Sequence, residues 1–180
     1  SLPVRMAAAA VRPYLQRWDR KSAAGVDRFV ANSHHIAQKV ARYYGREAVV
    51  IHPPVDLEVF ARAPLTGSGR GGYFLWFGAL APYKRADLAV EAFRSLDAEL
   101  WIGGAGQEEQ RLRRRLPANV RLLGQVPDDV LPALYRDARA LIFTGEEDFG
   151  IVPLEAQATG RPVIALARGG RSEARRVGKE

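Results

Sequence analysis

The chain has 180 residues, of which 47% are hydrophobic, so it can bury a core, and its length fits one domain together with part of another. It contains no cysteine, which excludes disulfides, thiolate metal sites and a cysteine nucleophile, and it has no apolar run of about 18 residues that could span a bilayer. The formal charge of +7 indicates an anionic partner but does not distinguish nucleic acid, phosphorylated small molecules and an acidic membrane face.

The first 55 residues alternate between helical and strand patterns. The order is helix, strand, helix and strand, at residues 3–24, 28–31, 34–44 and 48–51. Pro53 and Pro54, followed by a glycine-rich stretch at 67–72, punctuate the chain as a linker does. We therefore expect residues 1–55 to be the remnant of a preceding domain with its linker.

Residues 56–170 alternate short apolar strands with amphipathic helices. Strand patterns lie at 73–77, 99–102, 119–123, 138–143 and 162–166. Helical patterns separate them at 85–95, 107–116, 129–136 and about 152–159. Strands that are apolar throughout and separated by helices form a parallel sheet covered on both faces, so we predict a doubly wound α/β domain. Residues 171–180 lack apolar periodicity, and we expect a truncated or non-native tail there.

An acidic loop and the helix after it bring charged side chains and free backbone amides to one place in the sequence. Ligands of an open parallel sheet collect outside the carboxyl ends of its strands. Glu147 follows a predicted strand and Glu155 falls in the first turn of the next helix, so both carboxylates can border one crevice. Between them Gly150 permits close backbone approach, and the amides of Ile151 and Val152 can meet a diphosphate at the helix N-terminus. A solvated loop and a helix-stabilising glutamate also explain these residues.

The two glutamates stand in a motif that resembles the paired-glutamate motif of family 4 retaining glycosyltransferases, which have the GT-B architecture. This motif reads EDFGIVPLE. The resemblance continues through FGALAPYKRADLAVEAF, LWIGGAGQEE, NVRLLGQVPDDVLPALYRDARALIF and GRPVIA. Upstream, the segment from RWDRKSAAG to HPPVD is similar to the inter-domain region of bacterial members. The likeness therefore covers nearly everything from Arg17 to Gly170.

The resemblance implies a role for each candidate residue. Glu155 would accept hydrogen bonds from the donor ribose, and Glu147 would contact the transferred sugar beside its anomeric carbon. The amides from Phe149 to Val152 would hold the diphosphate. Lys84 would neutralise the phosphates and support departure of the nucleoside diphosphate, so Glu147 and Lys84 are the catalytic candidates. The nucleoside diphosphate sugar is then a co-substrate, and no cofactor or metal is expected.

The loop after the first of these strands departs from the family pattern. Many relatives carry arginine after the first-strand glycine, whereas this chain has Gly78, Ala79 and Leu80, so one of the two usual phosphate cations is missing. Gly78 remains a donor-binding candidate. Arg85, which directly follows Lys84, either replaces the missing cation in part or is a helix-start residue in water.

Other conspicuous residues have structural explanations. The cluster Gly103, Gly104 and Gly106 lacks the spacing of a dinucleotide fingerprint, and the resemblance implies that it lets the chain pass close to the nucleotide. Trp18 and Trp101 stand in apolar settings, and we expect both in the core.

The resulting functional hypothesis is a retaining sugar transfer from a nucleoside diphosphate sugar to an unknown glycan or lipid-linked acceptor, with no nucleic acid partner. Similarity to bacterial mannosyltransferase-like members favours GDP-mannose. Because most of the first domain is missing, we expect weak donor binding and no transfer by this chain alone. We expect a cytoplasmic location and leave open a peripheral association with the inner face of the membrane. The alternative is a nucleotide-binding or nucleic-acid-binding module without catalysis that acts through the basic surface.

Overall fold

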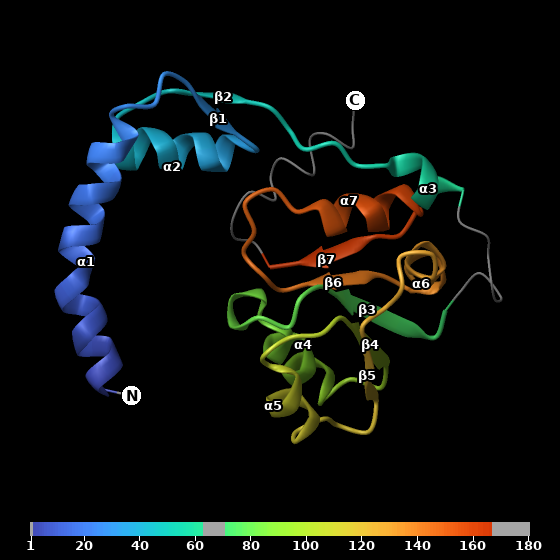
Figure 1. The fold of residues 1–180 in the computed structure, drawn as a ribbon. Coiled ribbons are helices and arrows are strands. Elements are labelled where there is room, and N and C mark those ends of the chain that lie inside the picture. The colour runs from blue at the N-terminus through green and yellow to red at the C-terminus, as the bar shows by residue number, and fades with distance from the viewer. Residues whose placement is uncertain (1, 63–70, 167–180) are drawn as a thin grey trace. The chain divides into compact units, whose positions relative to one another are not determined.

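A computed structural model describes residues 2–62 and 71–166 of the protein (Figure 1). The chain divides into two compact units, the first ending at His52 and the second beginning at Pro53. The tail expected at 171–180 and most of the glycine-rich stretch at 67–72 lie outside the described residues.

The first unit contains two helices and a two-stranded parallel sheet. Its elements are α1 (Leu2–Ala23), β1 (Phe29–Ala31), α2 (His34–Tyr44) and β2 (Ala48–Val50). Ser33 caps α2 by accepting a hydrogen bond from the Ile36 amide, and Gly45 ends the helix in the left-handed conformation that glycine adopts without strain. These caps explain why the predicted helix at 34–44 has the same bounds in the structure.

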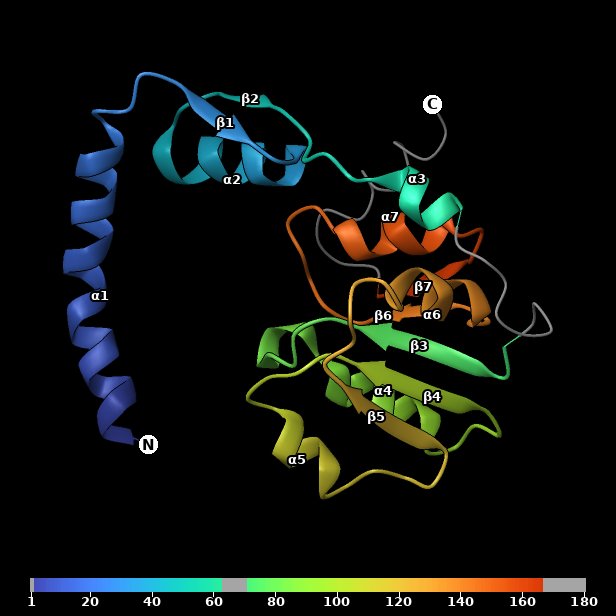
Figure 2. The ribbon, with the colours of Figure 1, turned by 45° about the vertical axis from the view of Figure 1, so that its right-hand side comes forward.

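The second unit is built on a five-stranded parallel sheet. Its strands are β3 (Tyr73–Phe77), β4 (Glu99–Gly103), β5 (Val120–Gly124), β6 (Leu141–Phe143) and β7 (Val163–Ala165). Their spatial order is β5-β4-β3-β6-β7, and every neighbouring pair is parallel (Figures 1 and 2). This confirms the predicted parallel sheet and its chain order.

Helices cover both faces of this sheet. They are α3 (Leu57–Ala61), α4 (Ala86–Phe93), α5 (Glu109–Arg113), α6 (Leu131–Asp137) and α7 (Ile151–Ala158), with a 3-10 turn, η1 (Pro82–Lys84), before α4. The core residues of α4 and α5 pack on one face, and those of α6 and α7 pack on the other (Figure 2). The domain is therefore doubly wound, as predicted.

The central strand shows why its sequence is apolar throughout. Phe74 and Trp76 pack into the core under α4, whereas Tyr73, Leu75 and Phe77 pack into the core under α6 and α7. Alternate side chains of a strand point to opposite faces, so a sheet covered twice needs apolar residues at every position. Each large apolar side chain that is fully buried contributes about 1.5–3 kcal/mol to stability.

Several element boundaries differ from the predicted ones for local reasons. The helix expected at 85–95 begins at Ala86, because residues 82–84 form the 3-10 turn and Arg85 adopts a left-handed φ of 56°. The strand expected at 138–143 is regular only over Leu141–Phe143, although Arg139 and Ala140 already make backbone hydrogen bonds to β3. The short helix α3 was not predicted; Asp56 caps it by accepting from the Val59 amide.

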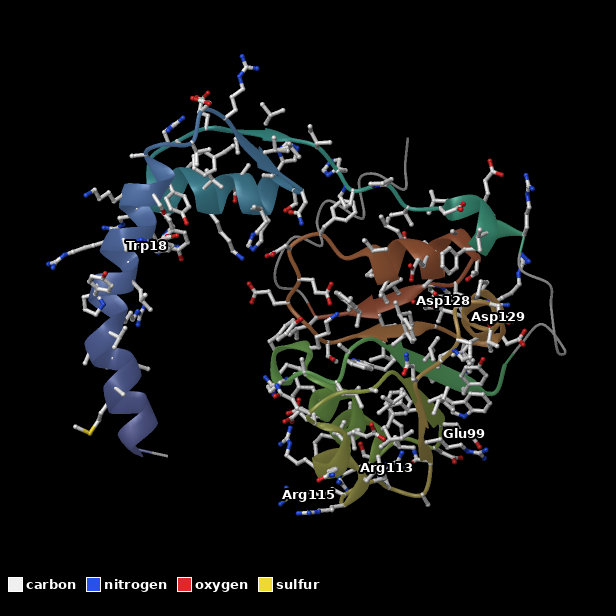
Figure 3. All side chains as sticks on the ribbon, viewed as in Figure 1. Trp18, Glu99, Arg113, Arg115, Asp128 and Asp129 are labelled. Carbon is white, nitrogen blue, oxygen red and sulfur yellow. The ribbon has the colours of Figure 1, made fainter. Side chains whose placement is uncertain are left out.

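The expectation that both tryptophans are core residues is wrong for Trp18. Its side chain projects from α1 and is 61% exposed (Figure 3). Trp101 is half-buried and stacks on Tyr73 with ring centroids 3.8 Å apart. The apolar neighbours of each tryptophan in the sequence therefore did not distinguish an exposed position on a helix from a position in a sheet.

Candidate functional site

The strand order locates the place where a ligand binds this type of sheet. β3 and β6 are neighbours, but β3 leads into a helix on one face and β6 into a helix on the other. Such a reversal opens a crevice outside the carboxyl ends of the two strands, which is the usual ligand position in open α/β sheets. The η1 turn and the loop between β6 and α7 lie at this edge (Figure 2).

Two predicted catalytic residues meet at this edge. Nζ of Lys84, at the end of η1, lies 2.7 Å from Oε1 of Glu147 in the β6–α7 loop. Their side chains are only 19% and 20% exposed, so the pair is largely shielded from water. Attraction between opposite charges is stronger in such a shielded setting than on an open surface. A cation and an anion from two separate loops are therefore held together where the topology predicts a ligand.

Thr144 holds the two loops in register. Its hydroxyl accepts a hydrogen bond from Trp76 Nε1 at 2.9 Å and lies within donating distance of the backbone oxygens of Lys84 at 3.0 Å and Arg85 at 2.8 Å. At the next position, a Cβ on Gly145 would lie 3.1 Å from Lys84 Cα. The backbone that carries Lys84 is therefore fixed from the end of β6, a role for Thr144 that the sequence did not reveal.

The glycine cluster after β4 has a packing role that was not foreseen. A Cβ on Gly104 would lie 1.9 Å from the Gly78 oxygen, and one on Gly106 would lie 2.6 Å from the Leu80 oxygen. The Gly78 amide also donates to the Gly103 oxygen at 3.1 Å. The two loops can approach this closely only without side chains. Gly78 itself borders the lysine, since its Cβ would lie 3.6 Å from Lys84 Nζ.

Arg85 forms an ion pair with Asp87 in the first turn of α4. Its Nε donates to Asp87 Oδ1 at 3.0 Å, and its Nη2 donates to Oδ2 of the same carboxylate at 3.2 Å. The arginine is exposed. This geometry is that of a helix-start residue, and a contribution of Arg85 to donor binding stays a prediction.

The N-terminus of α7 offers backbone donors at the same edge. Gly150 precedes the helix with a φ of 90°, and within the described part of the chain no side chain caps this end. The amides of Ile151 and Val152 belong to the first turn, whose N–H groups have no partner inside a helix. Phe149 and Leu154 are buried together, with Val55 packed against them, and this contact anchors the loop. This end of α7 is therefore suited to an anion.

Glu155 lies in the second turn of α7 and contacts a residue that the sequence did not single out. Its Oε2 accepts a hydrogen bond of 2.9 Å from the hydroxyl of Tyr135 on α6. Burial raises the pKa of Glu155, the hydrogen bond from Tyr135 acts against that shift, and the charge of Asp128 adds to it. Asp128 stands just before α6 (Figure 3). The structure thus brings Lys84 and Glu147 into contact and gives Glu155 a partner of its own.

Two negative findings concern the described residues alone. No helix within 2–62 or 71–166 is both long and apolar enough to cross a membrane. The same residues contain no group of three or more histidine, aspartate or glutamate side chains arranged to hold a metal ion.

Together these features define a doubly wound α/β protein with charged side chains at the carboxyl ends of its neighbouring strands β3 and β6. Comparison with protein families matches residues 71–180 to the family described as Glycosyl transferases group 1. Residues 3–59 match Glycosyltransferase Family 4. The chain therefore belongs to the group 1 glycosyltransferases.

Curated relatives carry related names. The D-inositol 3-phosphate glycosyltransferase of Geodermatophilus obscurus is 33% identical over 86% of this chain and 41% of its own length. The protein of the same name from Thermomonospora curvata is 31% identical over 87% of this chain and 44% of its own length. The chain thus spans less than half the length of these relatives.

Solved structures confirm the GT-B type of fold. Anabaena Alr3699/HepE in complex with UDP and glucose has a TM-score of 0.70 at 23% identity, covering 82% of this chain and 46% of that one. The catalytic domain of Starch Synthase IV from Arabidopsis thaliana, bound to ADP and acarbose, has a TM-score of 0.60 at 14% identity, covering 81% of this chain and 40% of that one.

Proposed function

We propose that the protein containing this chain transfers a sugar from a nucleoside diphosphate sugar to an acceptor hydroxyl. The observation that carries the proposal is the shielded contact of 2.7 Å between Lys84 and Glu147 at the edge where β3 and β6 end. A diphosphate sugar has an anionic part that needs a cation and a sugar part that becomes positive during transfer. Lys84 and Glu147 meet these two needs in one place.

In this proposal the diphosphate docks between the ammonium of Lys84 and the amides of Ile151 and Val152. Lys84 then exchanges its contact with Glu147 for phosphate oxygens and stabilises the charge that grows on the leaving nucleoside diphosphate. Glu147, released from Lys84, faces the sugar and stabilises positive charge at the anomeric carbon. Glu155 accepts hydrogen bonds from the ribose. Transfer with retention of configuration, as the sequence resemblance implies, completes the proposal.

The donor and acceptor are the parts of the proposal that experiment must choose. The sequence resemblance favours GDP-mannose, whereas the similar solved structures contain UDP or ADP, so all three bases belong in the test. The curated relatives act by name on D-inositol 3-phosphate, which makes an inositol phosphate the first acceptor to try, followed by lipid-linked glycans at the cytoplasmic face of a membrane.

A thermal-shift panel with UDP, GDP, ADP and their sugars tests the donor site. A ligand that binds only the folded state stabilises it by about 2.7 kcal/mol at one hundred times its Kd. We expect one base to raise the midpoint clearly, and Glu155→Ala to reduce that shift. Glu99→Ala is the matched control, because Glu99 is a carboxylate at the opposite, amino end of the sheet (Figure 3). Duplex DNA binding that salt weakens steeply, with no effect of any nucleotide, would instead favour a nucleic-acid-binding module.

Transfer assays test the domain assignment separately. We expect the 180-residue chain to bind a donor without transferring its sugar, because it spans less than half the length of its curated relatives. Efficient sugar transfer by this chain would contradict that expectation.

A further inference from the structure

The ribose-binding candidate Glu155 has one oxygen already engaged by a buried donor. The Tyr135 hydroxyl donates to Oε2 at 2.9 Å, and Oε1 makes no hydrogen bond within the described part of the chain. Tyr135 is completely buried, whereas Glu155 is half-buried. One end of the carboxylate therefore faces the core and the other is available to a ligand.

The tyrosine ring is held rigidly by its neighbours. Its edge contacts are with Phe60 of α3 at 5.8 Å and Phe77 of β3 at 5.9 Å, both between ring centroids. Aromatic rings in such edge-to-face arrangements pack closely. Burial also raises the pKa of the Tyr135 phenol, so the hydroxyl keeps its proton and remains a donor.

We propose that Tyr135 is a positioning residue of the donor site, whose hydroxyl holds Oε2 of Glu155 so that Oε1 is presented to the ribose hydroxyls. This inference rests on the proposed function, because it assigns a helper to the residue that binds the ribose there. Without the hydroxyl, the glutamate side chain samples more rotamers and loses a hydrogen bond to its ionised form. The preference for a nucleotide with ribose hydroxyls over one without them then weakens, whereas the diphosphate contacts at Lys84 persist.

A second buried tyrosine gives an unusually close control. Tyr73 packs in the same core cluster, and its hydroxyl also donates one hydrogen bond, at 2.8 Å, but to the backbone oxygen of Leu134. Tyr73→Phe and Tyr135→Phe therefore remove the same atom from the same core. Only Tyr135→Phe removes a donor from Glu155.

The experiment compares two ligands on each variant by titration calorimetry. The ligands are the nucleoside diphosphate that stabilises the protein most, chosen from UDP, GDP and ADP, and its 2′,3′-dideoxy analogue. We expect Tyr135→Phe to weaken the ribonucleotide about tenfold, as for one hydrogen bond to a charged group, and to leave the dideoxy analogue within about twofold. Tyr73→Phe should change neither by more than about twofold.

The outcomes separate this inference from the function beneath it. If Glu155→Ala weakens the ribonucleotide but Tyr135→Phe does not, or if both ligands weaken equally, the positioning role is wrong. If Glu155→Ala leaves ribose discrimination unchanged, or no nucleotide binds, the proposed function is wrong. Should Tyr135→Phe fail to fold, the hydroxyl proton of Tyr135 in the unsubstituted protein provides the test. Its NMR signal should move with the ribonucleotide and not with the dideoxy analogue, and an equal response to both contradicts the positioning role.

Discussion

The contact between Lys84 and Glu147 predicts that removing a catalytic charge will tighten binding of the leaving group. In the protein without ligand, Glu147 Oε1 lies 2.7 Å from Lys84 Nζ, the ammonium group that a diphosphate would use. About four fifths of each side chain is shielded from water. Glu147→Gln keeps the size of the side chain but removes its charge. Lys84 can then bind a diphosphate without first breaking an ion pair with Glu147.

The magnitude follows from the contact. A hydrogen bond between charged groups contributes about 1.5–3 kcal/mol net, and the partial exposure of this pair places it at the lower end. Because Lys84 no longer has to leave that contact, about 1.5 kcal/mol, the affinity of Glu147→Gln for UDP or GDP, without a sugar, should be about tenfold higher. Lys84→Gln should lower the same affinity by about tenfold to a hundredfold. Sugar transfer by the protein that contains this chain should fall in both variants.

Titration calorimetry at two salt concentrations measures these affinities directly. The control is Arg94→Gln, which removes a cation that is paired with Glu91 and lies outside the candidate site, and it should change the affinity by less than about threefold. If Glu147→Gln weakens the nucleoside diphosphate as much as Lys84→Gln does, the carboxylate does not compete for the lysine and the reasoning is refuted.

Three further predictions concern the surroundings of this pair. Gly104→Ala should destabilise the fold by about 3 kcal/mol or more in urea titrations, because its Cβ would lie 1.9 Å from the Gly78 oxygen, whereas Gly124→Ala meets no atom within 4 Å and should cost about 1 kcal/mol for its left-handed φ. Burial raises the pKa of Glu155 above 4.5, so the folded state binds this proton more tightly than the unfolded chain. The stability that this proton contributes should therefore be lost as the pH rises from about 4.5 through the raised pKa of Glu155. Urea titrations at a series of pH values should show this loss in the unsubstituted protein and not in Glu155→Gln. Ala79→Arg places the cation that many relatives carry at an exposed position. Calorimetry should show about tenfold tighter binding of a nucleoside diphosphate, and the thermal midpoint of the protein without ligand should not change.

The sheet could be predicted because its signal is local. The apolar run from Tyr73 to Phe77 fills both faces of a doubly covered sheet, and every such strand was found in its predicted place in the chain order. The 3-10 turn before α4 was not foreseen, because the backbone there is held by a hydrogen bond between the Arg85 oxygen and the hydroxyl of Thr144, which directly follows β6. Loop geometry of this kind is set by tertiary contacts.

The candidate site was only partly readable for the same reason. Lys84 and Glu147 stand after strands, where parallel topology brings residues together, so their meeting could be anticipated. Tyr135 and Thr144 lie 20 and 60 residues from the groups they position, and neither has a sequence signature of its own. The sequence indicated that Gly104 belongs to a loop that approaches the ligand, whereas the structure shows that it also lets two backbones pass close to each other.

Amide NMR shifts during titration with UDP and GDP test the central claim most directly. The account predicts that the largest changes cluster at Ile151, Val152 and the loop from Gly78 to Lys84, and that Lys84→Gln reduces them. Changes concentrated on α5, around Arg113 and away from the end of β6, would contradict a diphosphate site between β3 and β6.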